Sequence, residues 1–398
     1  MSAKPRPRLL PLQLALVAIA LTCTRGAWAA PKYKILHGFT GGKDGGGLWG
    51  SLLLDGKGNL YGPASEAVFK LTPQANGEWE MTVLHRFGYG NDGSGVVAGP
   101  ILDPTGNLYG TTANGGGPDR NGTVFKLTPR PDGTWGETIL YRFTAGGGEQ
   151  ADGGAVRDSQ GNLYGAGLEL SPGPKGWRLK VLHKFPSYQG DGVDPYAVPI
   201  LDASGNLYGT TQMGGGSSDC GGGCGTVYQL SPQLDGRWKE TILHSFQAHW
   251  DGAFPGVGAL VLDAAGNVYG TADGGNTGHG VIFRMSRGSD GRWKETVLYN
   301  IPNATDGDHP SAGVVMDKAG NLYGTTIAGG DPLCGCGVVY ELAPGANGKW
   351  VYTVLHTFVG SDGAQPDANL ILDDKGNLYG TTATGGPGGA GVAFELTP

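Results

Sequence analysis

The sequence predicts an all-β fold, a seven-bladed β-propeller of four-stranded antiparallel blades. Three observations lead to this prediction: a turn motif that recurs seven times, four short apolar runs around each copy, and a small residue at a fixed place before each copy. The motif recurs on average about every 53 residues, which is typical of propeller blades and excludes leucine-rich and helical arrays.

The recurring motif is Asp-x-x-Gly-Asn-Leu-Tyr-Gly, and Val268 is the only change at its Leu position. Strand-like apolar runs flank each copy, which predicts that the motif is the turn of a hairpin. In such a turn Asp bonds to nearby backbone, while Gly and Asn accept a positive φ. The copies begin at Asp55, Asp103, Asp158, Asp202, Asp263, Asp317 and Asp373.

Two further strands are expected in each repeat. A Gly-rich connection leads from the hairpin to a third apolar run, such as residues 123–129, and a second tight turn follows at pairs such as Asp132-Gly133. The fourth run begins at a tryptophan, such as Trp135. Gly or Ala always stands five residues before the motif Asp, which suits an innermost strand crowded near a central axis.

The two ends of the expected propeller are complementary. After the leader, the chain opens with a fourth-strand run at residues 34–39, and it closes at Pro398 with a third-strand run. We therefore expect the N-terminal strand to complete the last blade, which would leave no free sheet edge.

The N-terminus has the features of an export signal. Lys4, Arg6 and Arg8 precede an apolar run at residues 9–21, and Ala27-Trp28-Ala29 offers a cleavage site. We expect a signal peptide at residues 1–29, a single propeller domain at residues 30–398, and a periplasmic or extracellular location. No later segment is apolar enough to predict a transmembrane helix.

The net charge limits the classes of partner that the protein can bind, and the cysteines indicate disulfides or a metal site. Removing the four basic residues of the leader, which has no acidic residue, changes the formal net charge from −7 to −11, and this argues against nucleic acid and anionic membranes. Four cysteines remain, as two close pairs. In an oxidising compartment we expect local disulfides, with a four-cysteine zinc site as the alternative. The cysteines are Cys220, Cys224, Cys334 and Cys336.

The repeat resembles a known family. The segments Gly106-Asn107-Leu108-Tyr109-Gly110-Thr111-Thr112 and Gly122-Thr123-Val124-Phe125-Lys126-Leu127-Thr128-Pro129 are similar to the GloVer tandem repeat of exported bacterial proteins of the choice-of-anchor type. The resemblance covers residues 33–398 and implies no catalytic residues, because the family is of unknown function. Its members often end in an anchoring segment, whereas this sequence ends at Pro398. More distantly, the motif resembles the propeller repeat of the NHL type, a class with binding scaffolds and streptogramin lyases.

An Asp-Gly pair recurs in the linkers that enter the inner strands. Such carboxylates could form a ring at the channel mouth and hold a divalent cation such as calcium or bind sugar hydroxyls, but a recurrent Asp-Gly is more often a turn. The carboxylates are Asp44, Asp92, Asp191, Asp251, Asp306 and Asp362, with Asp152 nearer to its motif in the third repeat.

The histidines divide into two groups. Five occupy one position of the fourth strand, where a packing or surface role is expected; they are His37, His85, His183, His244 and His356. The other three occur singly in connections on the presumed mouth face, near several carboxylates. Imidazoles with carboxylates can bind a divalent metal or act as a general acid and base, although solvated loop histidines are the simpler interpretation. The candidate site is His249, Asp251, His279, Asp306, Asp308 and His309.

Three functional hypotheses remain open. The first is an exported, monomeric binding or interaction module for a glycan or a protein. The second is a metal-assisted lyase or hydrolase at the channel mouth, which requires the singular histidines to converge. The third is a passive structural protein of the cell envelope, in which no concave charged mouth is expected. Phosphate-binding loops, nucleophile elbows and His-Glu-x-x-His motifs are absent from the sequence.

Overall fold

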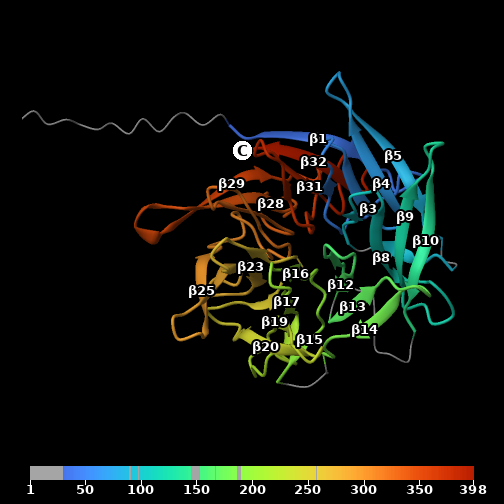
Figure 1. Ribbon diagram of the computed structural model, residues 1–398. Coiled ribbons are helices and arrows are strands. Elements are labelled where there is room, and N and C mark those ends of the chain that lie inside the picture. The colour runs from blue at the N-terminus through green and yellow to red at the C-terminus, as the bar shows by residue number, and fades with distance from the viewer. Residues whose placement is uncertain are drawn as a thin grey trace, which may run out of the picture. The chain divides into compact units, whose positions relative to one another are not determined.

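Seven antiparallel sheets of four or five strands follow one another along the chain and form the predicted seven-bladed β-propeller (Figure 1). The structure, a computed structural model, describes residues 30–398 apart from 89–90, 97, 145–152, 166, 186–189 and 257. The expected signal peptide and Asp152 lie outside the described residues. Residues Pro31–Pro398 form one compact unit.

The first three blades each run outward from a two-residue inner strand. Blade 1 contains β2 (Leu53–Leu54), β3 (Leu60–Ala64), β4 (Ala67–Pro73) and β5 (Trp79–Arg86). Blade 2 contains β7 (Ile101–Leu102), β8 (Leu108–Asn114), β9 (Thr123–Pro129) and β10 (Trp135–Arg142), and β6 (Ser94–Val96) also pairs with β8. Blade 3 contains β11 (Val156–Arg157), β12 (Leu163–Gly165), β13 (Leu168–Ser171) and β14 (Arg178–Val181).

The next three blades repeat this order. Blade 4 contains β16 (Ile200–Leu201), β17 (Leu207–Thr211), β19 (Thr226–Pro232) and β20 (Trp238–Ser245), beside a small pair of β15 (Gly192–Val193) and β18 (Met213–Gly214). Blade 5 contains β22 (Val261–Leu262), β23 (Val268–Asp273), β24 (Val281–Arg287) and β25 (Trp293–Asn300), with β21 (Ala253–Pro255) also on β23. Blade 6 contains β26 (Val315–Met316), β27 (Leu322–Thr326), β28 (Val338–Pro344) and β29 (Trp350–Thr357), with the 3-10 helix η1 (Ala346–Gly348) in its last turn.

Blade 7 joins the two ends of the described chain. It contains β30 (Ile371–Leu372), β31 (Leu378–Thr381), β32 (Val392–Thr397) and the N-terminal strand β1 (Lys32–Gly38). In Figure 1 the blue β1 lies beside the red β32, and the two strands pair antiparallel from Lys32 opposite Thr397 to Gly38 opposite Val392. The expected closure is therefore confirmed.

At five of the seven blade boundaries, an aromatic contact packs one blade against the next. The motif Tyr of one blade meets the Trp that opens the outer strand of the following blade, with ring centroids 6.5 Å apart for Tyr61 and Trp135. The same contact between Tyr379 and Trp79, at 6.3 Å, joins the last blade to the first. Such edge contacts stabilise beyond the apolar area that they bury. The repeated Tyr and Trp positions therefore hold the ring together.

The four cysteines of the described part form the two expected local disulfides, and they are consequently not available for the alternative four-cysteine zinc site. Cys220 bonds to Cys224, and Cys334 bonds to Cys336. Within the described part of the chain, no helix has the length and apolar character needed to cross a membrane.

Deleting residues 31–39 should lower the melting temperature by about 10 °C or more, because it removes β1 and leaves the edge of β32 unpaired. Differential scanning calorimetry of chains beginning at Pro31 and at Thr40 makes the comparison. Lys34→Ala, which keeps the backbone pairing, is the matched control and should leave the melting temperature nearly unchanged. Equal melting temperatures for the two chains would contradict a closing role for β1.

Candidate functional site

A central cavity of about 540 Å³ lies where the inner ends of the blades meet. Residues from all seven blades line it, and many are the small residues expected beside the axis, such as Gly50, Ala98 and Ala368. This volume lies within the range of small-molecule sites. The small residues therefore leave a space of ligand size at the axis of the propeller.

A few larger side chains provide the aromatic and polar groups of the cavity lining. Trp49 and Tyr196 are 49% and 36% exposed, and both belong to the lining. Asp367 and Asn369, from the entry to blade 7, add a carboxyl and an amide. One position of the repeat, five residues after the linker Asp, carries different residue types in different blades: Trp49, Tyr196 and Asp367.

The linkers reach the cavity through an unusual backbone conformation. Three residues after the linker Asp, four of them place a non-glycine residue at positive φ: Asp194 (58°), Phe254 (48°), His309 (55°) and Gln365 (58°). Few residues other than glycine adopt this conformation, and it costs on the order of 1–3 kcal/mol. Asp194 and Gln365 stand two residues before Tyr196 and Asp367 of the cavity lining, whereas the linkers of Phe254 and His309 enter the lining a few residues later, at Gly258 and Val314.

Two of the singular histidines meet at this edge. His279 Nδ1 lies 3.3 Å from Asp308 Oδ1, and His309 Nδ1 lies 3.4 Å from Asp273 Oδ2. His309 Nε2 is 4.0 Å from Asp308 Oδ1, so the Asp308 carboxylate lies near the rings of both His279 and His309. Asp273 ends β23 of blade 5, whereas Asp308 and His309 lie in the linker to blade 6. The cluster therefore bridges two blades.

This histidine cluster is coupled electrostatically to the central cavity. Burial raises the pKa of Asp273, while the neighbouring His309 opposes this shift. Burial also raises the pKa of Asp367, which accepts a hydrogen bond from Ser311 and is affected by the charge of Asp273. A proton held at the cluster therefore influences a carboxyl that lines the cavity.

The other candidate residues have separate partners. His249 lies 3.6 Å from Asp219. Asp251 is fully buried and is 3.0 Å from His244, and Asp306 accepts a hydrogen bond from Asn303. Of the six residues in the predicted site, the structure brings His279, Asp308 and His309 together, and it adds Asp273 to them.

Five of the six linker carboxylates pair with the repeated outer-strand histidines. The Nε2 to Oδ2 distances are 3.6 Å for His37 and Asp44, 3.9 Å for His85 and Asp92, 3.1 Å for His183 and Asp191, 3.0 Å for His244 and Asp251, and 3.0 Å for His356 and Asp362. None of the six lines the central cavity, because each linker starts at an outer strand and enters the lining only five to eight residues later. The repeated histidine thus fixes the start of the linker.

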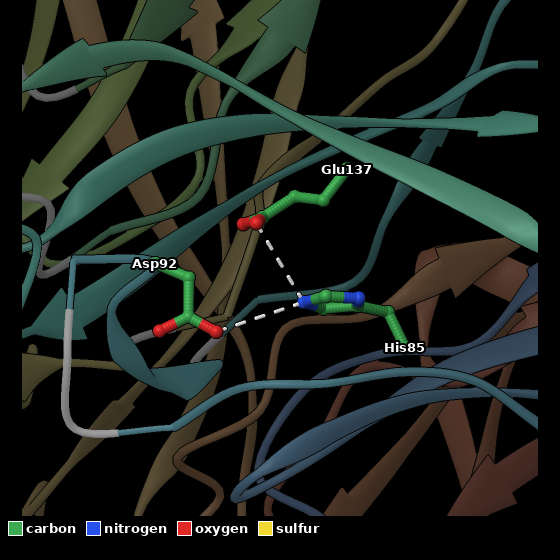
Figure 2. A group of neighbouring side chains, drawn as sticks. All are labelled: His85, Asp92 and Glu137. Atoms are coloured by element: carbon green, nitrogen blue, oxygen red, sulfur yellow. Dashed lines mark ion pairs between the residues drawn. The ribbon is translucent and has the colours of Figure 1, made fainter.

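A glutamate from the next blade joins two of these pairs, which sequence reasoning missed. Figure 2 shows Glu137 of β10 beside His85 and Asp92, with Glu137 Oε2 3.8 Å from His85 Nε2. Glu240 of β20 lies 3.5 Å from His183 in the same way. Burial raises the pKa of Glu137 to about 7 and that of Glu240 to about 8, with Asp92 and Asp191 adding to the respective shifts.

These two groups are compatible with a divalent cation. In each, one histidine nitrogen and two carboxylate oxygens all lie within 4.8 Å of one another. A nearby third boundary has His244, Asp251 and Glu295, and burial raises the pKa of Glu295 to about 7. The signal in the sequence would have been a Glu two residues after the Trp of an outer strand, which occurs at Glu137, Glu240 and Glu295, each after a blade that has His at the fourth-strand position.

Comparison with known proteins agrees with the repeat and the fold. Residues 273–398 match the family model of the Gloeobacter/Verrucomicrobia repeat. The chain contains this repeat. The match confirms the resemblance to the GloVer repeat over these residues, which extend from the end of β23 in blade 5 through blades 6 and 7. No curated protein matches the chain in sequence.

Similar solved structures include virginiamycin B lyase from Staphylococcus aureus, with 12% identity, a TM-score of 0.56, and coverage of 92% of this chain and 99% of the lyase. A catalytically inactive form of that lyase with quinupristin gives 14% identity and a TM-score of 0.57 over the same shares. A gluconolactonase from Xanthomonas campestris gives 13% identity and a TM-score of 0.45, covering 92% of this chain and 89% of the lactonase. At these identities, the likeness of the two lyase structures shows the propeller fold alone.

We expect the folded protein to lose stability as pH rises, and Glu295→Gln should remove the part of this loss that Glu295 causes. Between pH 4.5, the ordinary pKa, and about pH 7, folded Glu295 keeps a proton that the unfolded chain releases, so stability falls as pH rises through this window. Glutamine cannot ionise. The melting temperature of the variant minus that of the parent should therefore increase by a few °C from pH 4.5 to pH 7.5.

Glu78→Gln, at an exposed turn, is the control for this experiment and should follow the parent at every pH. Melting by circular dichroism at half-unit pH steps measures both differences. Parallel curves for Glu295→Gln and the parent would show that Glu295 does not titrate across this window.

Proposed function

We propose that this protein is an exported binding module that takes a carbohydrate at the mouth of its central cavity. Export is supported by the leader-like sequence at residues 1–29 and by the two disulfides, which persist in oxidising compartments. The module acts as a monomer, because closure of blade 7 by β1 leaves each described blade complete within one chain.

The observation that carries this proposal is the pairing of exposed aromatic rings with polar groups in one cavity. Trp49 and Tyr196 offer flat apolar faces together with polar edges, and sugar rings have apolar faces and a hydroxyl rim. Asp367 and Asn369 supply a carboxyl and an amide for the hydroxyls. A protein loop would require a larger apolar contact than these two exposed rings provide.

A second candidate function is a metal-assisted lyase or hydrolase, and the cluster of His279, His309, Asp273 and Asp308 favours it. In that case His309 would act as the general base, with Asp273 holding its ring, and carboxylates at the mouth would hold a divalent cation that would supply polarisation of the substrate. A cation such as calcium would take the carboxylate oxygens, whereas zinc would also take the imidazoles. Turnover of a bound oligosaccharide that His309→Ala abolishes would favour this candidate.

Trp49→Ala should weaken carbohydrate binding at least tenfold, since it removes an exposed ring from the cavity. A panel of neutral, acidic and amino-sugar oligosaccharides is screened first, and the affinity of the best binder is then measured by isothermal titration calorimetry. Asp367→Asn, which keeps the shape of the side chain, should also weaken binding. Trp250→Ala is the matched control, because Trp250 is 54% exposed and does not line the cavity.

Unchanged affinity in both Trp49→Ala and Asp367→Asn, or an equal loss in Trp250→Ala, would place carbohydrate binding elsewhere. A panel without any binder would contradict the proposal.

A further inference from the structure

Every blade boundary contains one repeated contact at its outer edge. In blades 1 to 6, the residue two places after the opening Trp of the outer strand corresponds to the position that faces the preceding blade's fourth-strand His or Tyr; we call it the facing position. It pairs with the apolar residue that recurs in the third strand of each blade, for example Glu137 with Leu127. In blade 7 the outer strand β1 has no Trp, and Tyr33 is the facing residue because it pairs with Leu396 in the same way. The facing residues are Met81, Glu137, Leu179, Glu240, Glu295, Tyr352 and Tyr33.

Within this one chain, glutamate occurs at the facing position only opposite histidine. Where Tyr replaces His at position 299, Tyr352 stacks on it at 4.7 Å. His356 keeps its pair with Asp362, but a ring and not a glutamate occupies the facing position, since Tyr33 lies 3.9 Å from His356 with the rings nearly parallel. Stacked aromatic rings are therefore sufficient to fill the space at these two boundaries. The glutamates require another explanation, because burying a carboxyl against a ring is unfavourable without a partner.

Each glutamate boundary contains at least one buried carboxyl oxygen without a hydrogen-bond partner. His85 Nε2 and Glu137 Oε1 are shielded from solvent and make no hydrogen bond, and the same holds for Glu240 Oε1. Glu295 has only 9% of its surface exposed, and neither of its carboxylate oxygens has a hydrogen-bond partner. In all three cases, the facing position thus aims an unsatisfied carboxylate at the boundary where the histidine and the linker Asp lie.

We propose that His85, Asp92 and Glu137 bind a divalent transition-metal ion of the zinc type, and that His183, Asp191 and Glu240 form a second copy of this site. His85 Nε2 lies 3.9 Å from Asp92 and 3.8 Å from Glu137, too far for hydrogen bonds but close enough for ligands of one ion (Figure 2). One imidazole with two carboxylates suits zinc, with water as a fourth ligand. Calcium prefers oxygen ligands alone.

The third boundary is closed more tightly than the second and does not bind the ion. His183 also lies within hydrogen-bond distance of Asp191, at 3.1 Å, but Glu240 is 3.5 Å from the same ring and Asp191 keeps part of its surface exposed. Asp251 has no exposed surface, and its oxygens already accept from the backbone N–H of Gln247 and contact His244. Among the described residues, no ion pair joins Glu295 to His244 within 4.0 Å. His37 is opposite Met81 and has one carboxylate partner only. The boundaries in the described part of the chain therefore provide two sites of this kind.

Each ion would join two blades at their outer edges, away from the central cavity. His85 and Asp92 come from blade 1 and the linker that leaves it, whereas Glu137 comes from blade 2. An ion held only by the folded chain raises its stability by mass action. The two ions would consequently stabilise the packing of neighbouring blades, and their sites are independent of the carbohydrate site proposed above.

Zinc stoichiometry tests the two sites directly. The chain, prepared without a histidine tag and freed of metal by a chelator, is equilibrated with zinc, desalted and analysed by inductively coupled plasma mass spectrometry. We expect two zinc ions per chain in the parent, one in Glu137→Gln, and none in Glu137→Gln combined with Glu240→Gln. The parent should melt several °C higher with zinc than without it, and the double variant should not.

His37→Gln is the matched control, because it changes the same repeated histidine at a boundary without glutamate; it should keep two ions. Circular dichroism establishes that each variant is folded, and the conservative Glu137→Asp and Glu240→Asp variants should retain zinc with weaker affinity. A parent chain that retains no zinc, or a double variant that retains as much as the parent, overturns the proposal and leaves ion pairs as the role of these residues.

Discussion

The fold depends on a carboxylate that organises the same turn seven times. In blade 1, Asp55 Oδ1 accepts hydrogen bonds from the backbone N–H groups of Lys57 and Asn59, and Oδ2 accepts from the Asn59 amide and the Tyr61 hydroxyl. Burial alone would raise the pKa of Asp55, but these bonds outweigh it and lower the pKa. Gly58 supplies the positive φ of the turn. Because this Tyr ring then meets the next blade's Trp, one carboxylate connects the local turn to the packing between blades.

A scaffold fixed in this way leaves other positions free to differ between blades. The facing position at the outer edge holds Glu, Tyr, Leu or Met, and the chemistry of each boundary changes with it. The linker position five residues after the Asp places Trp49, Tyr196 and Asp367 into one cavity. Residues that repeat therefore maintain the ring, whereas residues that vary at a repeated backbone position give the propeller its specific chemistry.

The sequence was sufficient to predict the architecture because local signals determine it. The turn motif, the strand periods and the unmatched ends predicted the blades and the pairing of β1 with β32, and the close cysteine spacing predicted both disulfides. The candidate site was harder to predict because its contacts are not local. Glu137 lies 52 residues from His85, and only the lateral packing of two blades brings them together. Whether a linker residue lies at the rim or the axis likewise depends on the path of the chain, which composition does not reveal.

The linker position with positive φ holds different residue types on the two sides of the mouth. Blades 1 and 2 place glycine at this position, with Gly47 at 61° and Gly95 at 69°, as the backbone prefers. The next four linkers with this geometry use Asp194, Phe254, His309 and Gln365, although glycine would remove the strain. Strain of this kind persists where the side chain has a use. Since His309 also takes part in the cluster that influences Asp367, the carbohydrate site that we propose would extend from the cavity toward the side of blades 4 to 7.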